Sequence, residues 1–404
     1  PPATAASGGS PPIVRALAVR VMEPVGAAGL EPHPSGDRQQ GEPFRQKTVA
    51  LGERPGINFH KSLDLAAGPI GIEMAAVLKR AGYSYLHLEA GTVGEAIRHW
   101  PRFTRFFSSP EWISIAGIPI QNPDQSIPTG EECLAYLRHI VETLALDIHT
   151  YEPVIETHGE HGNFTVLTRD LAGNTNEYRG KTIILATGDL NRPRRLNLPG
   201  EDLPHVTHLW RDPHEYFQRR LLIVGGRNSA IEAAVRCWRA GARVTLSYRR
   251  AALDESVTIS WLFLEARLLI EKGQIEFLPE TEPQQFLPGE TIMKDGRRVP
   301  ADFVYLATGF EMDYTLYDQL GVARSGPEAR PQFDEETMET NVPGVYVVGT
   351  ATGGNQKSFS VFITTSHVHS LRVGRALDPH RKIEPGWVGN IEERDYPLSS
   401  ADIE

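Results

Sequence analysis

The sequence predicts an α/β protein built from two related domains. Two stretches, residues 63–91 and 220–250, share one order of elements: a short apolar strand, a glycine-containing turn, a helix rich in small residues and a second strand. An apolar strand that ends in Ala-Thr-Gly also occurs twice, at residues 183–188 and 303–309. Because each of these strand endings follows one of the two units, we expect two domains of common construction.

Composition and charge exclude several classes of protein. The chain has 404 residues, which is long enough for two or three domains, and its net charge of −10 comes from well-mixed acids and bases. It therefore lacks the basic surface that binds nucleic acid. No run of eighteen apolar residues occurs, so we expect no membrane span.

The cysteines limit the chemistry further. Cys133 and Cys237 lie far apart in the sequence, and no C-x-x-C pair occurs. This spacing argues against a dithiol of neighbouring cysteines, a cysteine-based zinc cluster and a disulfide scaffold. We therefore expect no metal site, and a reducing cytoplasmic location.

The second unit begins with a strand at residues 221–224, whose apolar run fits a buried parallel strand. Gly225 and Gly226 follow at once and allow a tight turn in which backbone N–H groups approach a pyrophosphate closely. We expect Asn228 and Ser229 to cap the helix that starts there, so that its N-terminus faces the phosphates. This unit therefore predicts a dinucleotide site.

The end of the second unit indicates which dinucleotide it binds. The strand at residues 244–246 is followed by Tyr248, Arg249 and Arg250 rather than by an acid. An acid would bind the ribose 2′-OH of NAD, whereas arginines suit the 2′-phosphate of NADP, so we favour NADPH. The alternatives are a solvated basic edge and an ordinary strand–helix crossover, because Arg227 stands where a third close glycine is usual.

The first unit predicts another dinucleotide site. Gly68, Pro69 and Gly71 form its turn, and Glu89 ends the strand that follows its helix, about twenty residues past the glycines. An acid at that distance binds an adenosine ribose hydroxyl. The site would therefore prefer a dinucleotide with a free 2′-OH, such as FAD or NAD.

One feature of the first unit departs from the usual pattern. Ala66 occupies the place of the first glycine, and the strand before it, residues 62–65, is short and contains Asp64. A buried first strand should be a longer apolar run. The alternative interpretation is a degenerate nucleotide-binding protein whose first pocket no longer holds FAD.

Between the two units the sequence predicts a further helix at residues 129–144. Thr129 can cap it, and Glu131 and Glu132 in its first turn suit the positive end of the helix dipole.

The remaining glycine-containing turns follow apolar strands. A strand that ends in Ala-Thr-Gly brings backbone close to a ligand, and the strand at residues 345–348 leads into a glycine-rich turn at 349–354. A helix expected at about 360–377 would aim its dipole at an anionic ring edge. In that helix, His367 and His369 are either polar helix residues or groups that act near the ring. The candidate cofactor-binding residues from these segments are Thr187, Gly188, Gly309, Gly349 and Thr350.

Two segments lack such patterns. Residues 1–56 are rich in Pro, Gly, Ala, Ser and Gln, and we expect a disordered or non-native N-terminal segment. Residues 381–404 are expected to form a loose tail.

The order of motifs along residues 63–378 resembles a known family. The chain contains, in order, GPIG, Glu89, ATG, LPGEDLPHV, IVGGRNSA, YRR, LATGF and ETMETNVPGVYVVG. This combination is similar to the flavoproteins of the thioredoxin-reductase type, which have two dinucleotide-binding domains. The likeness is greatest to the bacillithiol-disulfide reductase branch of that family.

The resemblance implies a domain order and a set of contacts. Two Rossmann-like domains are implied: an FAD domain made of residues 57–210 and 311–380, split by an inserted NADPH domain at residues 211–310, and the family also suggests a homodimer. The implied FAD contacts are Gly68, Gly71, Glu89 and the turn at Gly349. The implied NADPH contacts are Gly225, Asn228, Ser229, Arg249 and Arg250.

The chain departs from the family where thiol chemistry is concerned. The position of the cysteine in the first glycine motif of the bacillithiol branch is Ile70 here, the C-x-x-C of thioredoxin reductases is absent, and Thr350 replaces an acid that commonly binds the ribityl chain. Hydride transfer from NADPH to flavin needs orientation rather than a cysteine. We therefore expect an FAD-dependent NADPH oxidoreductase that passes electrons to a small molecule or a small redox protein, with no catalytic residue identified.

Two other functions stay open from the sequence. A disulfide reductase could use a non-local thiol, for which Cys133 is the candidate. A nucleotide-binding paralogue without FAD is the second, because of Ala66 and the weak first strand.

Overall fold

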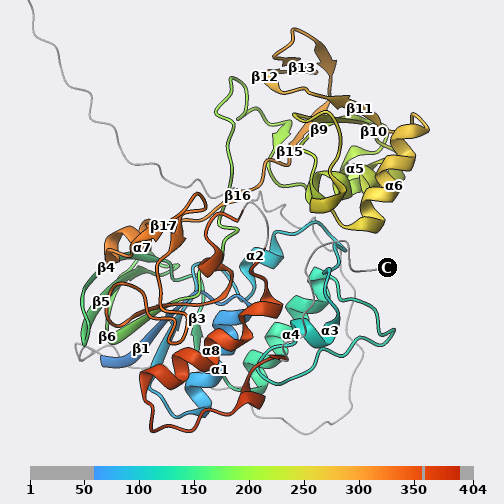
Figure 1. The fold of residues 1–404 in the computed structure, drawn as a ribbon. Helices are drawn as coiled ribbons and strands as arrows, with labels where there is room; N and C mark the ends of the chain where they lie inside the picture. The colour runs from blue at the N-terminus through green and yellow to red at the C-terminus, as the bar shows by residue number, and fades with distance from the viewer. Residues whose placement is uncertain (1–58, 357–359, 392–404) are drawn as a thin grey trace, which may run out of the picture. The chain divides into compact units, whose positions relative to one another are not determined.

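The computed structural model describes residues 59–356 and 360–391. The N-terminal segment at residues 1–56 and the end of the tail at residues 392–404 lie outside the described residues. Within the described ranges the fold is α/β, with two Rossmann-like sheets that each have a parallel centre (Figure 1).

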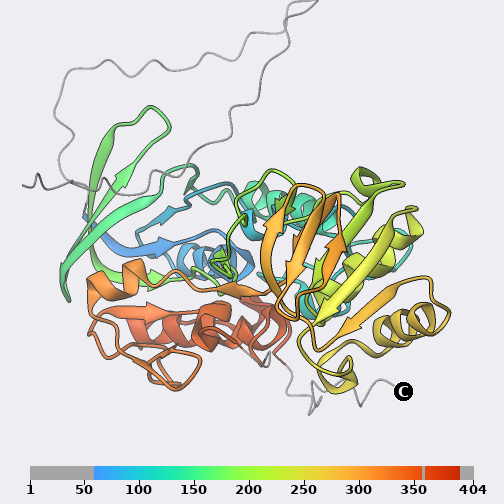
Figure 2. The same ribbon diagram turned by 90° about the horizontal axis from the view of Figure 1, so that it is seen from above.

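The first sheet has seven strands in the order β3-β2-β1-β6-β5-β4, and β19 pairs with β6 beside this path. Strands β3, β2, β1, β6 and β19 are parallel neighbours, whereas β5 runs antiparallel to β6 and β4 antiparallel to β5, and β4 forms one edge of the sheet (Figure 2). The strands are β1 Phe59–Leu65, β2 Tyr85–Leu88, β3 Ile148–His149, β4 Val154–Glu160, β5 Asn163–Arg169, β6 Thr175–Leu185 and β19 Val345–Val347.

Strand β1 is longer than the sequence indicated. It spans seven residues, Phe59–Leu65, and pairs with β2 on one side and β6 on the other. Asp64 lies within it and is fully buried. The expectation of a short strand at residues 62–65 is therefore wrong, because pairing on both sides sustains a strand that its own composition does not favour.

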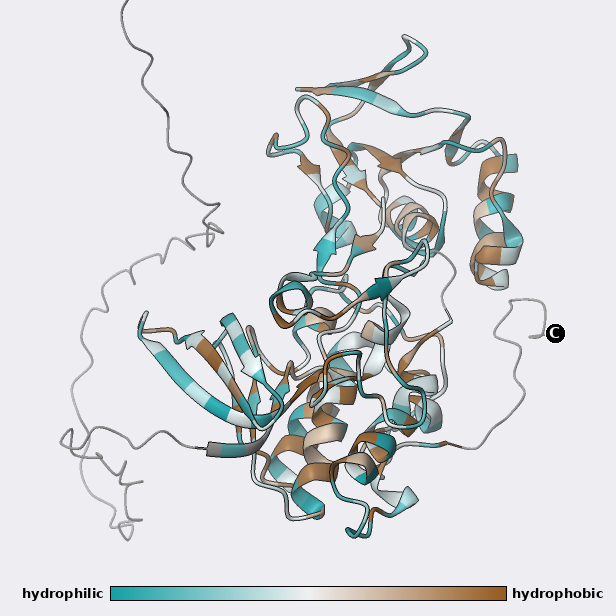
Figure 3. Cartoon of the chain, turned by 60° about the vertical axis from the view of Figure 1, so that its left-hand side comes forward, coloured by the Kyte–Doolittle hydropathy of each residue, from teal (hydrophilic) through white to brown (hydrophobic). Residues whose placement is uncertain are grey.

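Helices cover this sheet, and apolar residues, drawn brown, gather on them in Figure 3. Thr129 caps α4 as predicted: its side chain accepts the N–H of Glu132, whose carboxylate accepts the N–H of Thr129. The helices of this part are α1 Pro69–Arg80, α2 Glu95–Arg98, α3 Pro110–Ile113, α4 Gly130–Thr143, α7 Thr315–Leu320 and α8 Ile363–Leu377.

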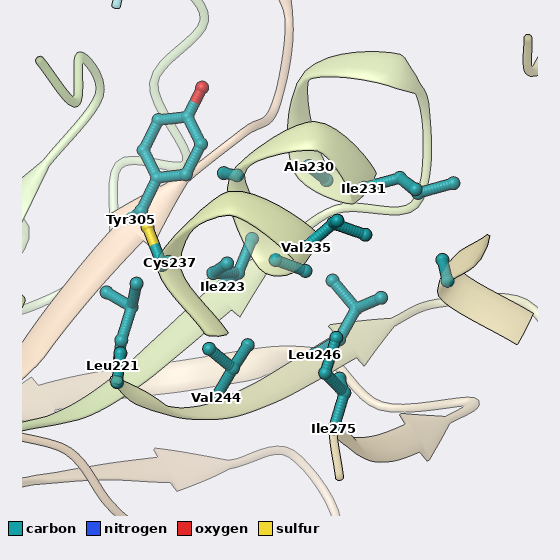
Figure 4. Close-up of a cluster of buried hydrophobic side chains, with 14 of the residues drawn as sticks. Leu221, Ile223, Ala230, Ile231, Val235, Cys237, Val244, Leu246, Ile275 and Tyr305 are labelled. Atoms are coloured by element: carbon teal, nitrogen blue, oxygen red, sulfur yellow. The ribbon is translucent and has the colours of Figure 1, made fainter. Parts of the chain in front are cut away.

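The second sheet has five parallel strands in the order β11-β10-β9-β15-β8. Its core lies between β9, β10 and helix α5, where Ile223, Val235 and Leu246 are fully buried or nearly so (Figure 4). The elements are β8 Val206–Thr207, β9 Arg220–Val224, α5 Asn228–Arg239, β10 Arg243–Tyr248, α6 Ser260–Glu271, β11 Glu276–Pro279 and β15 Phe303–Leu306.

Smaller sheets complete the described chain. Strands β12 Pro283–Leu287, β13 Glu290–Met293 and β14 Arg298–Pro300 form an antiparallel sheet. Two two-stranded sheets pair β7 Arg192–Pro193 with β16 Phe310–Glu311, and β17 Arg324–Ser325 with β18 Arg330–Pro331. In the described parts of the chain, no helix is long and apolar enough to cross a membrane.

A buried acid–histidine pair joins distant parts of the first half. Glu73 on α1 lies 3.1 Å from Nδ1 of His367 on α8, and its carboxylate also accepts the N–H groups of Ala116 and Gly389. Nε2 of His367 lies 2.9 Å from the carbonyl oxygen of Trp112. Because both ring nitrogens face acceptors, the protonated imidazole can donate to both and pair with the carboxylate of Glu73.

The expectation of a loose tail at residues 381–404 is wrong for its first part, residues 381–391. Residues 381–391 are packed: Ile383 and Val388 are buried against α1 and α8, and Gly389 donates its N–H to Glu73. A buried carboxylate needs donors, and the backbone of this segment supplies one.

The ion pair makes stability depend on pH in a defined direction. Burial by itself lowers the pKa of His367, but the hydrogen bond and charge of Glu73 outweigh it and raise the pKa above 6.5. The pair therefore contributes its full stabilisation of the folded state below about pH 6.5. This contribution is lost as the pH rises through the pKa of His367 in the folded state. We expect His367→Gln to lower the unfolding free energy in urea by about 1–3 kcal/mol at pH 6 and by less at pH 9.

The matched control is His380→Gln, which removes an exposed histidine after α8. It should leave the pH dependence of unfolding unchanged. A cost of His367→Gln that stays constant or grows between pH 6 and pH 9 would contradict the ion pair.

Candidate cofactor sites

The first glycine turn connects β1 to α1 at the carboxyl edge of the first sheet. Gly71 has to be glycine, because a Cβ there would lie 1.9 Å from the carbonyl oxygen of Ala66. Gly68 precedes the helix in an extended conformation, with nothing within 4 Å of its Cβ position, and Pro69 takes the first helical position. The start of α1 is thus an open helix N-terminus next to bare backbone, which suits a pyrophosphate.

The backbone of this turn keeps the glycine conformation although the first glycine is absent. Ala66 has φ +96°, in the region that residues with a Cβ disfavour. Such a residue costs about 1–3 kcal/mol and persists only when its surroundings hold it. At this position Ala66 therefore adopts a backbone conformation that glycine would take freely.

Glu89 lies against the same turn. Its carboxylate accepts the N–H of Ala67 at 2.5 Å and that of Gly91 at 2.7 Å, and burial raises its pKa. The backbone of Glu89 is fixed by the next segment, since its N–H donates to His149 and its carbonyl accepts the N–H of Glu152, both at 2.9 Å. The structure thus brings the predicted acid and the predicted turn together.

The ends of two further strands, β6 and β19, also lie at this edge, although they are far apart in sequence. Strands β6 and β19 are parallel, with Leu185 opposite Val347, so both end at the same edge. A Cβ at Gly188 would lie 3.6 Å from the hydroxyl of Thr350, and one at Gly349 would lie 3.3 Å from Ile70. The predicted residues therefore converge on the place where open α/β sheets bind ligands.

Thr187, a predicted cofactor contact, has its side chain and its carbonyl in contacts within the protein, the carbonyl accepting from Asn191 at 2.7 Å. Its hydroxyl pairs with that of Tyr317 at 2.9 Å, and the Tyr317 side chain is fully buried. The Thr187 side chain is therefore occupied by the core.

Asp189 is a functional candidate that the sequence analysis missed. It is 7% exposed, accepts a hydrogen bond from Nε2 of Gln356 at 3.0 Å and lies within hydrogen-bond reach of the Thr350 side chain. Burial raises its pKa. Its signal in the sequence is weak: it directly follows Ala-Thr-Gly, but an acid after a strand end has no special pattern.

The two histidines of α8 have partners inside the protein. Nδ1 of His369 accepts the N–H of Gly349 at 3.1 Å, and burial lowers the pKa of His369 to about 4, so the ring is neutral. His367 is held by Glu73. These contacts favour the interpretation of both as framework residues; His369 fixes the turn at Gly349.

The second glycine turn is closed tightly by its surroundings. Gly225 has φ +151°, and a Cβ there would lie 2.6 Å from the carbonyl oxygen of Ala307. A Cβ at Gly226 would lie 2.5 Å from the ring of Tyr248. Both glycines are therefore required by close approach, one to the end of β15 and one to the end of β10.

The predicted cap of α5 is not formed. The helix begins at Asn228 with Arg227 as N-cap residue, and no side chain caps it. The Oδ1 of Asn228 accepts the N–H of Ile259 at 3.0 Å, so this side chain fixes the approach to α6, while Ser229 is exposed at the helix start. A tertiary contact has replaced the local cap, and the free N–H groups at the start of α5 remain for a ligand.

The basic end of the second unit is accessible. Arg249 and Arg250 are exposed after β10, and Arg250 lies 3.1 Å from Asp254. Gly309, after the second Ala-Thr-Gly, has φ +89° and accepts the N–H of Arg194 at 2.9 Å.

Comparison with known proteins decides the family. Residues 66–349 match the family model of the pyridine nucleotide-disulphide oxidoreductases. The chain belongs to this family. It is 30% identical over 321 residues to bacilliredoxin reductase of Bacillus subtilis, covering 78% of this chain and 97% of that protein. It is 26% identical over 307 residues to a ferredoxin–NADP reductase of Ignicoccus hospitalis, covering 72% and 90% of the two chains.

Solved structures agree with this assignment. The bacillithiol disulfide reductase from Bacillus cereus superposes with a TM-score of 0.76 at 28% identity, covering 79% of this chain and 99% of that chain. Lactococcus lactis thioredoxin reductase shares the fold, with a TM-score of 0.61 at 21% identity over 79% and 97% of the chains. This family member is a flavin-dependent oxidoreductase that uses FAD and NADPH, and the open position at Gly68 at the start of α1 suits a pyrophosphate.

The cysteines of this oxidoreductase are poor nucleophiles. Cys133 and Cys237 are free and buried, and burial raises the pKa of each thiol to about 12. The thiolate is the reactive form, so neither side chain is active near neutral pH. Among the described residues, no group of three or more His, Cys, Asp or Glu could hold a metal ion.

The contacts of Asp189 predict a role in cofactor binding. Replacing it with Ala removes the acceptor shared by Gln356 and Thr350, so we expect FAD affinity of the apoprotein to fall about tenfold. Quenching of FAD fluorescence on titration measures this affinity. Asp202→Ala, at an exposed acid in a surface ion pair, is the control and should bind FAD like the parent. Unchanged affinity of Asp189→Ala would remove Asp189 from the site.

Proposed function

We propose that this protein takes hydride from NADPH through bound FAD and passes electrons to a small acceptor without a protein thiol. The observation that carries the proposal is the combination of two glycine turns, each leading from a parallel strand into a helix, with two cysteines that are buried and protonated. Bound FAD supplies the two-electron carrier. The chain supplies orientation: helix N-termini and bare glycine backbone for the phosphates, and a carboxylate for the ribose.

We assign the cofactors to the two sheets. FAD is proposed for the domain of residues 57–210 and 311–380, and NADPH for residues 211–310, except that β8 (Val206–Thr207) pairs with β15 and so belongs to the second sheet. In support, β19 from the third segment pairs with β6 from the first. For FAD we propose Gly68, Pro69, Gly71, Glu89, Thr187, Gly188, Gly349 and Thr350. For NADPH we propose Gly225, Gly226, Asn228, Ser229, Arg249, Arg250 and Gly309, with Asn228 acting through its backbone.

The acceptor is proposed to be a small molecule or a small redox protein. The names of two relatives point to bacilliredoxin and ferredoxin as partners of those proteins. A homodimer and a cytoplasmic location are proposed with it; two free thiols suit a reducing compartment.

The two other functions are less well supported. A disulfide reductase would need a reactive thiol, whereas Cys133 is 2% exposed with a raised pKa. A paralogue without FAD would need a broken first turn, whereas Ala66 keeps the glycine conformation.

Spectroscopy tests the proposed function directly. The purified protein, reconstituted with FAD, should absorb at flavin wavelengths and bleach on anaerobic addition of NADPH. Cys133→Ser and Cys237→Ser should bleach and reoxidise with an artificial acceptor at rates within about twofold of the parent, because protonated thiols take no part in the reaction. A colourless protein that takes up no FAD would contradict the proposal. Loss of turnover in Cys133→Ser, with bleaching intact, would instead favour the lone-thiol reductase.

Coenzyme choice is the second test. The double variant Arg249→Ala/Arg250→Ala should raise KM for NADPH about tenfold or more and leave KM for NADH within about twofold. The reason is that each substitution removes a charged hydrogen bond to the 2′-phosphate, which NADH lacks. Steady-state reduction of an artificial acceptor measures both values. Arg243→Ala is the matched control, because Arg243 is exposed at the opposite end of the same strand, β10. An equal rise for both coenzymes would argue against contact with the phosphate.

A further inference from the structure

The two peptide groups on either side of Ala66 are both held by contacts. Its N–H donates to the carbonyl oxygen of Leu88 on β2 at 2.8 Å. Its carbonyl oxygen lies over Gly71, at the place a Cβ there would occupy. Between these two points the residue has φ +96°, which glycine would adopt freely and alanine does not.

The partner of the Ala66 carbonyl is a histidine side chain. Nε2 of His87 on β2 lies 3.1 Å from that oxygen, and the ring is fully buried. Burial lowers the pKa of His87 to about 4, so the ring is neutral and carries one proton. Since a carbonyl oxygen can only accept, this proton is on Nε2 and is donated to Ala66.

Asp64 stands beside this contact without replacing it. Strand pairing places Asp64 opposite His87, with Oδ2 at 3.7 Å from Nε2, and burial raises the pKa of Asp64 well above its usual range. Within residues 59–356 and 360–391, neither the carboxyl oxygens of Asp64 nor Nδ1 of His87 have a hydrogen-bond partner. Buried polar atoms without hydrogen-bond partners destabilise the folded state. Among the described residues, the one hydrogen bond that the His87 side chain makes is to the carbonyl oxygen of Ala66, the residue with positive φ.

We propose that His87 is a positioning residue for the cofactor turn, which holds Ala66 in the glycine conformation by donating to its carbonyl oxygen. This rests on the proposed function in one respect, the assignment of that turn to the pyrophosphate of FAD. The role follows from what the carbonyl controls. If Ala66 relaxed to negative φ, its carbonyl would leave Gly71, and the next peptide would rotate the N–H of Ala67 away from Glu89.

The proposal accounts for a side chain that a buried parallel strand does not favour. A strand paired on both sides is normally apolar, and His87 lies in β2 between β1 and β3. A leucine there would pack as well but would leave the Ala66 carbonyl without its donor. Histidine at position 87 and alanine at position 66 are therefore coupled, and this coupling is measurable.

A double-mutant cycle tests the coupling. The chains are the parent, His87→Leu, Ala66→Gly and the double variant, each titrated with FAD as apoprotein. With Ala66 present, His87→Leu should lower FAD affinity about tenfold, because without the donor the alanine relaxes toward the negative φ that it prefers and the turn loses its shape. With glycine at position 66 the same change should cost less than about threefold, because glycine adopts positive φ unaided.

Two further variants separate positioning from packing. His87→Gln places an amide Nε2 the same number of bonds from Cβ and should recover most of the affinity. Asp64→Asn alters the neighbouring buried side chain, which makes no hydrogen bond to Ala66, and should bind FAD like the parent. Thermal unfolding of the apoproteins gives the same cycle without any cofactor: the fall in midpoint on His87→Leu should be smaller when residue 66 is glycine.

The outcomes distinguish this proposal from the proposed function. Equal losses of affinity and midpoint in the parent and Ala66→Gly backgrounds, or no recovery with His87→Gln, would overturn the role of His87 while FAD still binds. Failure of the parent and of Ala66→Gly to bind FAD would overturn the proposed function. In that case the thermal cycle alone would decide whether His87 holds the turn.

Discussion

The parallel pairing of β6 with β1 on one side and with β19 on the other is the constraint on which the rest of the first site depends. Parallel neighbours end at the same edge of a sheet, so three strand ends separated by more than a hundred residues of chain deliver their turns to one place. The Ala66 carbonyl, the backbone at Gly188 and the turn at Gly349 meet there for this reason alone. The second sheet repeats the arrangement, where β9 and β15 end together and Gly225 abuts Ala307.

Turns that bring backbone close to a ligand have unfavourable conformations, and contacts in the protein interior offset this free energy. The turns need positive φ and missing side chains, and neither is favourable in isolation. The structure offsets this with buried polar contacts placed next to each turn: His87 at Ala66, His369 at Gly349 and Glu89 at Ala67. Each contact fixes a peptide that a ligand would otherwise have to order on binding, which is the usual gain from preorganisation.

How much of this was predictable from the sequence depends on whether a feature is local. Strand–turn–helix units, the cap at Thr129 and the position of Glu89 follow from short-range patterns, and the described structure has them. The order of the domains could be named only through the resemblance. The predictions that were wrong concern long-range contacts. Asn228 accepts the N–H of Ile259 instead of capping α5, and residues 381–391 pack against the protein, where Gly389 donates its N–H to the buried Glu73.

The same distinction explains why Asp189 and the pair Glu73–His367 were missed. An acid after a strand has no special pattern, and its burial depends on Gln356, more than a hundred residues later. A histidine in a helix can be a surface residue or half of an ion pair, and the partner, on a helix near the other end of the described chain, is not visible in either local sequence. Spacing identifies a turn, but only the sheet order identifies what the turn lies against.

The lack of a reactive thiol is consistent with this architecture. In the proposed sites, both glycine turns would act through backbone, helix ends and a few charges, none of which depends on a cysteine. A thiol of a disulfide reductase must reach the cofactor and ionise, and both cysteines fail on each count: each is buried in a hydrophobic cluster, with a pKa of about 12. Under the proposed function, the half of the reaction that loads electrons is retained while the half that discharges them into a disulfide through a protein thiol is not. Such a protein would differ from its disulfide-reducing relatives in its acceptor, not in how it obtains electrons.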